Sequence, residues 1–328
     1  MITMRLEKRN LYDEGEYDHI GTYGFCPNIV PYIHEDDVER PAVLVVPGGA
    51  YRFCSPTEGE PVALNFYDRG FQTFVVTYTT NPLDMSPVGK QALNDLARAV
   101  RLIRHYAAEY HVRKDMIAIC GFSAGGHATA SLCVHFREVT EPNGTYADES
   151  PRPDLSILAY PVITSDPSYT HLESMELLLG NDMTDEQLQF TANEKNVSEE
   201  TPPAFIWHTF DDNTVPPRNS IEYAKALNEK GVPVSLHVFT KGMHGLATAD
   251  GKSAVTMDNS YTYEPLVILM EALKKGLIRP GGLKDPVKDI GKLERQLLRR
   301  EYDEAVREPE AEVWTELAEK WMKSMFKK

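Results

Sequence analysis

Basic residues are scarce in this 328-residue chain: 34 Lys and Arg residues stand against 49 Asp and Glu residues, which gives a formal net charge of −15. A strongly negative surface repels phosphate backbones and anionic lipid headgroups, so we expect no nucleic-acid partner. Long apolar runs are also absent, and none approaches the roughly 20 residues that a helix needs to cross a bilayer. The chain is therefore not expected to act on DNA or RNA, or within a membrane.

Cysteines and metal-binding motifs are equally sparse. The four cysteines, at positions 26, 54, 120 and 133, show no C-x-x-C spacing, which fits a reducing compartment. The first residues contain no apolar segment of the signal-peptide type, and we expect a cytoplasmic protein. No H-E-x-x-H or similar cluster occurs, so the sequence predicts no catalytic metal and no cofactor.

What the sequence does contain is a regular alternation of apolar runs with helical patterns. Strands are expected at 42–46, 71–78, 117–120, 155–160, 204–208 and 234–239. Such an alternation is typical of a mostly parallel, doubly wound sheet with helices on both faces. Because no clear linker and no internal repeat interrupts it, we expect a single α/β domain over residues 1–328.

One of the expected helices has a strong local start signal. Ser55, Pro56 and Glu58 offer an N-cap residue, a proline at the first position and an acidic residue at the third. These residues predict a helix that is capped by Ser55 and ends near Gly70.

The segment GFSAGG, residues 121–126, directly follows an expected strand. A strand that reverses sharply into a helix needs small residues at the bend, and Gly121 and Gly125 supply them. Ser123 would then stand at the tip of the bend, in the geometry of a nucleophile elbow. A serine hydroxyl is a poor nucleophile by itself and needs a base to take its proton.

Partners for Ser123 occur further along the chain in the order that a doubly wound hydrolase sheet requires: serine, acid, histidine. Asp211 and Asp212 follow strand 204–208, and His244 follows strand 234–239. All candidates thus fall at the carboxyl ends of strands, where they can meet. Either aspartate could reach the imidazole from its loop.

An oxyanion intermediate also needs backbone donors. The elbow supplies the N–H of the residue after the nucleophile, Ala124, and the loop after an early strand supplies a second donor. That loop begins Pro47-Gly48, and Gly49 is our first choice for the donor, with Ala50 next.

Several longer motifs carry a family resemblance: PGGAYRF, NDLARAVRLIR, GFSAGGHATA, LLGNDMT, TPPAFIWHTFDDNTVPPRNS and GMHGL. Together they resemble α/β-hydrolase serine esterases of the bacterial acetylxylan-esterase and carbohydrate-esterase type, over residues 40–250 and again in a closing helix at 313–326. The resemblance implies that Ser123 is the nucleophile and His244 the base. It also selects Asp212, four residues before the proline of the V-P pair, as the acid. Pro47 stands where many relatives carry the histidine of an H-G-G motif.

The resemblance further implies the reaction, which is hydrolysis of small-acyl esters of carbohydrates, above all acetyl esters, through an acyl-enzyme. The expected substrate is a small-molecule or oligosaccharide ester. A feruloyl or general short-chain carboxylesterase is the nearest alternative, and a serine peptidase or a non-catalytic binding protein is more remote. Tyr51 and Phe53 could line the acyl or sugar pocket, or could instead pack under the sheet edge.

Residues 251–308 are not explained by the resemblance and predict a helical insertion. Its first pattern is an apolar stripe formed by Leu266, Leu269, Met270, Leu273 and Leu277. A second, highly charged pattern spans about 286–307. The pair could fold onto its own domain, form a lid or form a subunit contact, and we favour a homo-oligomer contact through residues 259–308.

Overall fold

A computed structural model describes residues 4–17, 19, 22–84, 86–252, 261–278 and 306–327 of the chain. Its strands form one sheet with the order β1-β3-β5-β4-β6-β7-β8-β9, and β2 also pairs with β3. Neighbours from β5 to β9 run parallel, whereas β1, β2 and β3 join antiparallel. The strands are β1 (Met4–Arg5), β2 (Arg9–Asn10), β3 (Asn28–Ile33), β4 (Arg40–Val46), β5 (Gln72–Thr77), β6 (Val112–Phe122), β7 (Leu155–Ala159), β8 (Ala204–Thr209) and β9 (Val234–Phe239).

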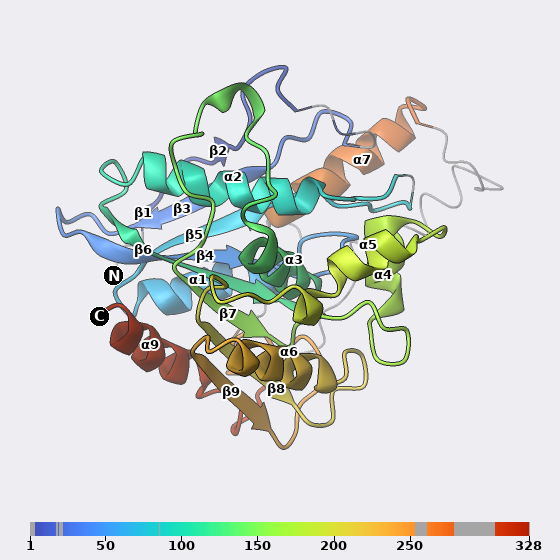
Figure 1. Cartoon of the computed structure of the whole chain (residues 1–328). Helices are drawn as coiled ribbons and strands as arrows, with labels where there is room; N and C mark the ends of the chain where they lie inside the picture. The colour runs from blue at the N-terminus through green and yellow to red at the C-terminus, as the bar shows by residue number, and fades with distance from the viewer. Residues whose placement is uncertain are drawn as a thin grey trace.

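Helices cover both faces of this sheet (Figure 1). The helices α1 (Glu60–Tyr67) and α9 (Trp314–Met325) pack on one face. The helices α2 (Gln91–His105), α3 (Ser123–His135) and α6 (Arg218–Glu229) pack on the other. This is the α/β-hydrolase fold that the sequence predicts.

Strand β4 shows how the sequence builds two cores from one strand. Its side chains alternate, so that Val43 and Val45 lie in the core beneath α1 and α9, while Leu44 and Val46 lie in the core beneath α2 and α3. All four are fully buried, as expected of a strand covered on both faces.

Smaller elements complete the description. These are α4 (Leu172–Leu179), α5 (Asp185–Thr191) and α7 (Glu264–Lys274), with the 3₁₀ turns η1 (Pro56–Glu58), η2 (Pro142–Gly144), η3 (Asn193–Lys195) and η5 (Tyr261–Tyr263). In the described stretches, no helix is long and apolar enough to cross a membrane.

The helix start predicted at Ser55 is wrong in detail. Residues Pro56–Glu58 form only a 3₁₀ turn, no side chain caps it, and α1 begins at Glu60. The Glu58 side chain turns away from the helix start because it accepts hydrogen bonds from two other segments, which are described below.

The C-terminal insertion is described only in part. Its first apolar stripe forms α7, and Leu266, Leu269 and Leu273 are buried in a cluster with Phe53 of the same chain. Leu277 lies beyond the end of α7 and is 74% exposed. Because α7 packs on its own domain, its stripe needs no partner subunit. The second pattern, about 286–307, falls almost wholly outside the described residues, and the homo-oligomer contact stays a prediction.

Candidate active site

Ser123 lies at the junction of β6 and α3, where the chain turns sharply. Its φ of 51° is in the left-handed region, which is costly for a residue with a side chain. A Cβ added at Gly121 would lie 2.3 Å from Thr129 Oγ1, and one at Gly125 would lie 2.3 Å from the carbonyl oxygen of Pro47. Both glycines are therefore required by close approach of neighbouring chain segments, which allows the strained turn to form.

His244 lies between Ser123 and Asp212, within hydrogen-bond distance of both. Its Nε2 is 2.8 Å from Ser123 Oγ, and its Nδ1 is 2.7 Å from Asp212 Oδ2. The carboxylate accepts from Nδ1–H, which leaves Nε2 as the acceptor for the serine proton. The three residues come from the ends of β6, β8 and β9, as the sequence order predicts.

Asp212 is held as a buried carboxylate, 4% exposed. Its Oδ1 accepts from the backbone N–H groups of Thr214 and Val215, each at 2.9 Å. Burial raises the pKa of Asp212, but hydrogen bonds from His208 and His244 outweigh it, and the net pKa lies well below the usual range. The lowered pKa keeps Asp212 ionised near neutral pH.

Asp211 occupies a different position in the same loop. It is exposed, and its Oδ1 accepts from the backbone N–H of Gly242 at 2.7 Å. Asp211 thus ties the acid loop to the loop that carries His244, and it is Asp212 whose carboxylate meets the imidazole.

The loop after β4 approaches the elbow closely, since a Cβ added at Gly48 would lie 2.9 Å from Ser123 Cβ. The N–H of Gly48 is already donated to Glu58, whereas no acceptor among the described residues takes the N–H of Gly49 or Ala50. Ala124 is the second residue of α3, so its N–H also has no partner within the helix. Gly49 has a φ of 118°, and a Cβ there would lie 2.2 Å from the carbonyl oxygen of Phe53. Glycine is therefore required at this turn.

Tyr51 and Phe53 are both buried. The Phe53 ring lies 5.8 Å from that of Tyr263 and packs in the same cluster as Leu266, Leu269 and Leu273 of α7, rather than under the sheet edge. Tyr51 Oη lies 2.7 Å from His127 Nδ1, and His127 Nε2 lies 3.0 Å from the Thr191 carbonyl oxygen.

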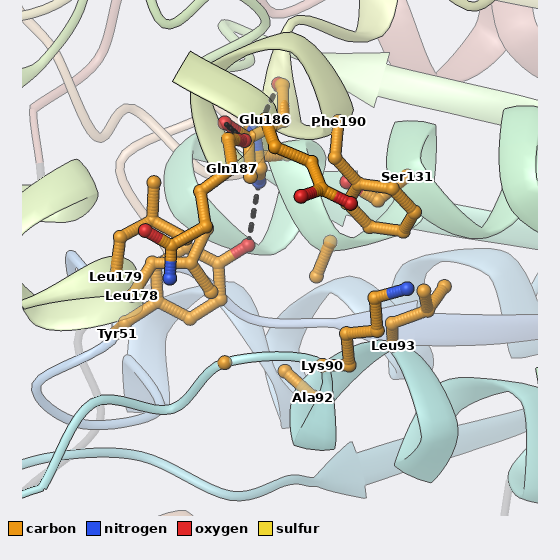
Figure 2. Close-up of a pocket in the computed structure, with 14 residues that line it drawn as sticks. Tyr51, Lys90, Ala92, Leu93, Ser131, Leu178, Leu179, Glu186, Gln187 and Phe190 are labelled. Carbon is orange, nitrogen blue, oxygen red and sulfur yellow. Dashed lines mark hydrogen bonds between the residues drawn. The ribbon is translucent and has the colours of Figure 1, made fainter. Parts of the chain in front are cut away.

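Tyr51 also lines a pocket of ≈ 200 Å³ between α2, α3, α4 and α5, beside Leu178 and Leu179 (Figure 2). Ser123 and His244 do not line this pocket. Tyr51 therefore borders a cavity that is separate from the elbow, and the structure does not place it against the nucleophile.

The chain is similar in sequence and fold to several known proteins. The family model described as BD-FAE matches residues 31–227. The chain belongs to the BD-FAE family. It is 47% identical over 243 residues to the endo-1,4-beta-xylanase B of Butyrivibrio fibrisolvens, a match that covers 74% of this chain and 38% of that protein. It is 33% identical over 242 residues to the acetylxylan esterase of Xylanibacter ruminicola, covering 72% of this chain and 45% of that protein.

Solved structures of similar fold include the acetyl ester-xyloside bifunctional hydrolase of Caldicellulosiruptor lactoaceticus. Its TM-score is 0.69 at 32% identity, and the match covers 83% of this chain and 97% of that one. The BD-FAE family member described here thus matches nearly the whole of that structure, but it spans less than half the length of the curated relatives named above.

Two further residues bond the loops around this candidate site, Glu58 and Tyr160. The sequence does not single them out, because Glu58 fits the pattern of a helix start and Tyr160 that of a strand end. Within the described residues, no group of three or more His, Cys, Asp or Glu side chains could hold a metal ion.

Proposed function

We propose that the protein hydrolyses carboxylic esters through a Ser123–His244–Asp212 triad and an acyl-enzyme. The observation that supports this most strongly is the pair of short contacts on either side of His244, 2.8 Å to Ser123 Oγ and 2.7 Å to Asp212 Oδ2. A hydroxyl, a neutral imidazole and a fixed carboxylate in this line form the arrangement that activates serine.

In the acylation step, Ser123 Oγ attacks the ester carbonyl carbon while His244 Nε2 takes the hydroxyl proton. The carbonyl oxygen becomes an oxyanion, and the N–H groups of Ala124 and Gly49, with Ala50 next, are the donors proposed for it. Collapse of the intermediate breaks the bond to the alcohol oxygen, which leaves with the proton from His244. Asp212 remains ionised and stabilises the imidazolium that forms in between.

In the deacylation step, water takes the place of the alcohol. His244 Nε2 removes a proton from the water as its oxygen attacks the acyl carbon. The second tetrahedral intermediate collapses, the proton returns to Ser123 Oγ, and the carboxylic acid is released. The enzyme therefore ends the cycle in the protonation state in which it began.

For the substrate, we propose a small acyl group, acetyl, esterified to a carbohydrate. The support is that one relative is named an acetylxylan esterase and a similar structure an acetyl ester-xyloside hydrolase. An aromatic acyl ester is the second candidate. Phe210, 73% exposed, lies two residues before Asp212, and Met243, 61% exposed, directly precedes His244, so both offer apolar surface for a ring.

A substrate panel tests the proposal: p-nitrophenyl esters of rising chain length, acetylated xylo-oligosaccharides, methyl ferulate and an aminoacyl amide. We expect acetyl esters to be hydrolysed faster than esters of eight or more carbons. Methyl ferulate as the best substrate would favour the aromatic alternative, and hydrolysis of the amide alone would refute the esterase proposal.

A further inference from the structure

Glu58 is a carboxyl group buried beside the proposed active site and is absent from the mechanism above. It is 4% exposed, and its two oxygens accept hydrogen bonds, one from the start of the same β4–α1 connection and one from the residue after β7. Oε2 accepts from the backbone N–H of Gly48 at 2.8 Å, and Oε1 accepts from Tyr160 Oη at 2.8 Å. Glu58 therefore joins the loop after β4 to the residue that follows β7.

Tyr160 continues this connection to the histidine loop. Its Oη accepts the backbone N–H of Ala247 at 2.9 Å, three residues after His244. Its ring centroid lies 5.0 Å from that of His244, in an edge-to-face arrangement. Since Tyr160 Oη accepts from Ala247, its one proton is available for Glu58, which fits the hydrogen-bond directions on both sides.

The Gly48 end of the connection lies against the elbow. A Cβ added at Gly48 would lie 2.9 Å from Glu58 Oε2, 2.9 Å from Ser123 Cβ and 2.7 Å from the carbonyl oxygen of Phe122. The N–H of Gly48 belongs to the Pro47–Gly48 peptide, so Glu58 holds the peptide directly before the Gly48–Gly49 peptide, which carries the first proposed oxyanion donor, the N–H of Gly49. A shift of the Pro47–Gly48 peptide would move Gly48 Cα and so reorient the next peptide, with the N–H of Gly49, relative to the ester oxygen.

We propose that Glu58 and Tyr160 are positioning residues, and that together they hold the oxyanion loop and the histidine loop in fixed positions around Ser123. We call this connection the Glu58–Tyr160 bridge. The inference rests on the proposed ester hydrolysis, because the positions it fixes matter only to that chemistry.

Energetics argue against stability as the sole role of the bridge. Burial raises the pKa of Glu58, and the hydrogen bond from Tyr160, the nearby His244 and the Gly48 N–H offset this only in part. A buried carboxyl group is an inefficient way to stabilise a fold, because apolar side chains of similar size often do as well or better. The bridge instead fixes the orientation of two loops far apart in the sequence, because each loop donates one backbone N–H to it, from Gly48 and from Ala247.

The chain offers a matched control for the test. Asp95 is a fully buried carboxyl group that also accepts from a tyrosine, Tyr12 Oη, at 2.8 Å. Its other partners are Thr79 and Gln91, which belong to neither the oxyanion loop nor the histidine loop. Glu58→Gln and Tyr160→Phe can thus be compared with Asp95→Asn and Tyr12→Phe, which remove the same chemical groups elsewhere.

The experiment measures kcat and KM for an acetyl ester, together with the rate at which a fluorophosphonate modifies Ser123. For both bridge variants we expect kcat to fall by about 10- to 100-fold per folded molecule, with KM changed by less than about threefold. The modification rate should fall in parallel. The control variants should lose thermal stability but retain kcat within about twofold. The double variant Glu58→Gln/Tyr160→Phe should be little worse than either single one, since they break one connection.

A kcat in Glu58→Gln and Tyr160→Phe equal to that of the controls would overturn the bridge, and so would a change confined to KM. If Glu58→Gln does not fold, Tyr160→Phe decides alone, because it removes only a hydroxyl group. Ser123→Ala separates this inference from the proposed function. If Ser123→Ala hydrolyses the ester as well as the wild type does, the proposed function fails and the bridge fails with it. If Ser123→Ala is inactive but both bridge variants keep the wild-type kcat and fluorophosphonate rate, the bridge alone fails.

Discussion

Two buried polar networks in this molecule differ in what they connect. At the end of the sheet that carries the proposed triad, called the catalytic end below, Ser123, His244, Asp212, Glu58 and Tyr160 join the loops that follow β4, β6, β7, β8 and β9. Around helix α2, a second network, which we call the α2 cluster, consists of Tyr12, Asp95, Arg98 and Glu141. It attaches the N-terminal segment and the loop before η2 to helix α2.

Backbone conformation separates the two networks. Of the ten described residues other than glycine with a positive φ, six lie in loops of the catalytic end: Ala50, Tyr51, Ser123, Tyr160, Ala247 and Ala249. None is a member of the α2 cluster. Strain is retained where surrounding contacts enforce it and where a function requires that geometry. The comparison indicates that the α2 cluster mainly raises the free energy of unfolding. The strained loops at the catalytic end lower it, and surrounding contacts hold these loops in place.

The largest effect is expected at the acid of the catalytic end. Asp212→Asn should lower kcat by about 10⁴-fold, because an amide can hold the wrong tautomer of His244. Asp211→Asn, in the same loop, should lower it by less than about tenfold, because Asp211 bonds only the Gly242 N–H. Steady-state kinetics with p-nitrophenyl acetate measures both. Asp211→Asn as the more damaging change would show that the wrong aspartate has been assigned.

Removing a charge from the α2 cluster should affect stability and leave turnover intact. The Arg98 side chain is almost completely buried and pairs with Glu16 at 2.7 Å and with Glu141. Arg98→Met should lower the free energy of unfolding by about 3 kcal/mol, since two largely buried carboxylates lose a charged partner, although Glu141 keeps Arg101 at 3.1 Å. The control, Arg137→Ala, breaks an exposed ion pair with Glu200 and should change the free energy of unfolding by less than about 0.5 kcal/mol. Urea unfolding measures both, and a fall in kcat per folded molecule of Arg98→Met would contradict the division into two roles.

His127 should make the fold sensitive to acid. Burial lowers the pKa of His127 to about 4, from an ordinary value of 6.5. The folded pKa lies below the unfolded one, so its contribution is complete above pH 6.5 and is lost as the pH falls towards 4. Between these limits the wild type should lose about 2–3 kcal/mol through this group.

Urea unfolding of the wild type and of His127→Gln at pH 7.5 and 4.5 measures this contribution. The variant, which has no ring to protonate, should start less stable and lose less on acidification. Equal losses in the two proteins would rule His127 out as the source of the acid sensitivity.

Of these predictions, the one expected to matter least for kcat concerns the oligomer contact predicted for residues 259–308. Size-exclusion chromatography with light scattering should give a mass above that of the 37.0 kDa chain at micromolar concentration. A monomer would show that the predicted oligomer contact is wrong. The packing of α7 against Phe53 of the same chain would then be the role of that helix.

The elements and the triad order were predictable because their signals are local. Apolar runs bounded by glycine and proline locate β4 and β6, and Gly121 with Gly125 identifies the bend at Ser123. The N-terminal strands were not predicted. Strand β3 contains Pro31, which reads as a break, and its pairing with β5 is antiparallel and depends on residues far along the chain.

Glu58 shows the limit of local patterns most clearly. Three residues after Ser55 it matches the acidic position of a capping box, yet its partner Tyr160 is 102 residues further along the chain. The carboxyl group accepts from a buried hydroxyl and from the Gly48 N–H, while the Ser55 N–H that a capping box would use is donated to the carbonyl oxygen of Gly48. A spacing rule cannot reveal such a choice, because it depends on which loops the sheet brings together.

The central claim, that Ser123 is acylated during turnover, is tested most directly by rapid acid quenching of the enzyme while it hydrolyses an acetyl ester, followed by peptide mass mapping. We expect one acetyl group on the peptide that contains Ser123, and none on the same peptide from Ser123→Ala. Ester hydrolysis that proceeds with the acetyl group on another residue, or that persists in Ser123→Ala, would contradict the account.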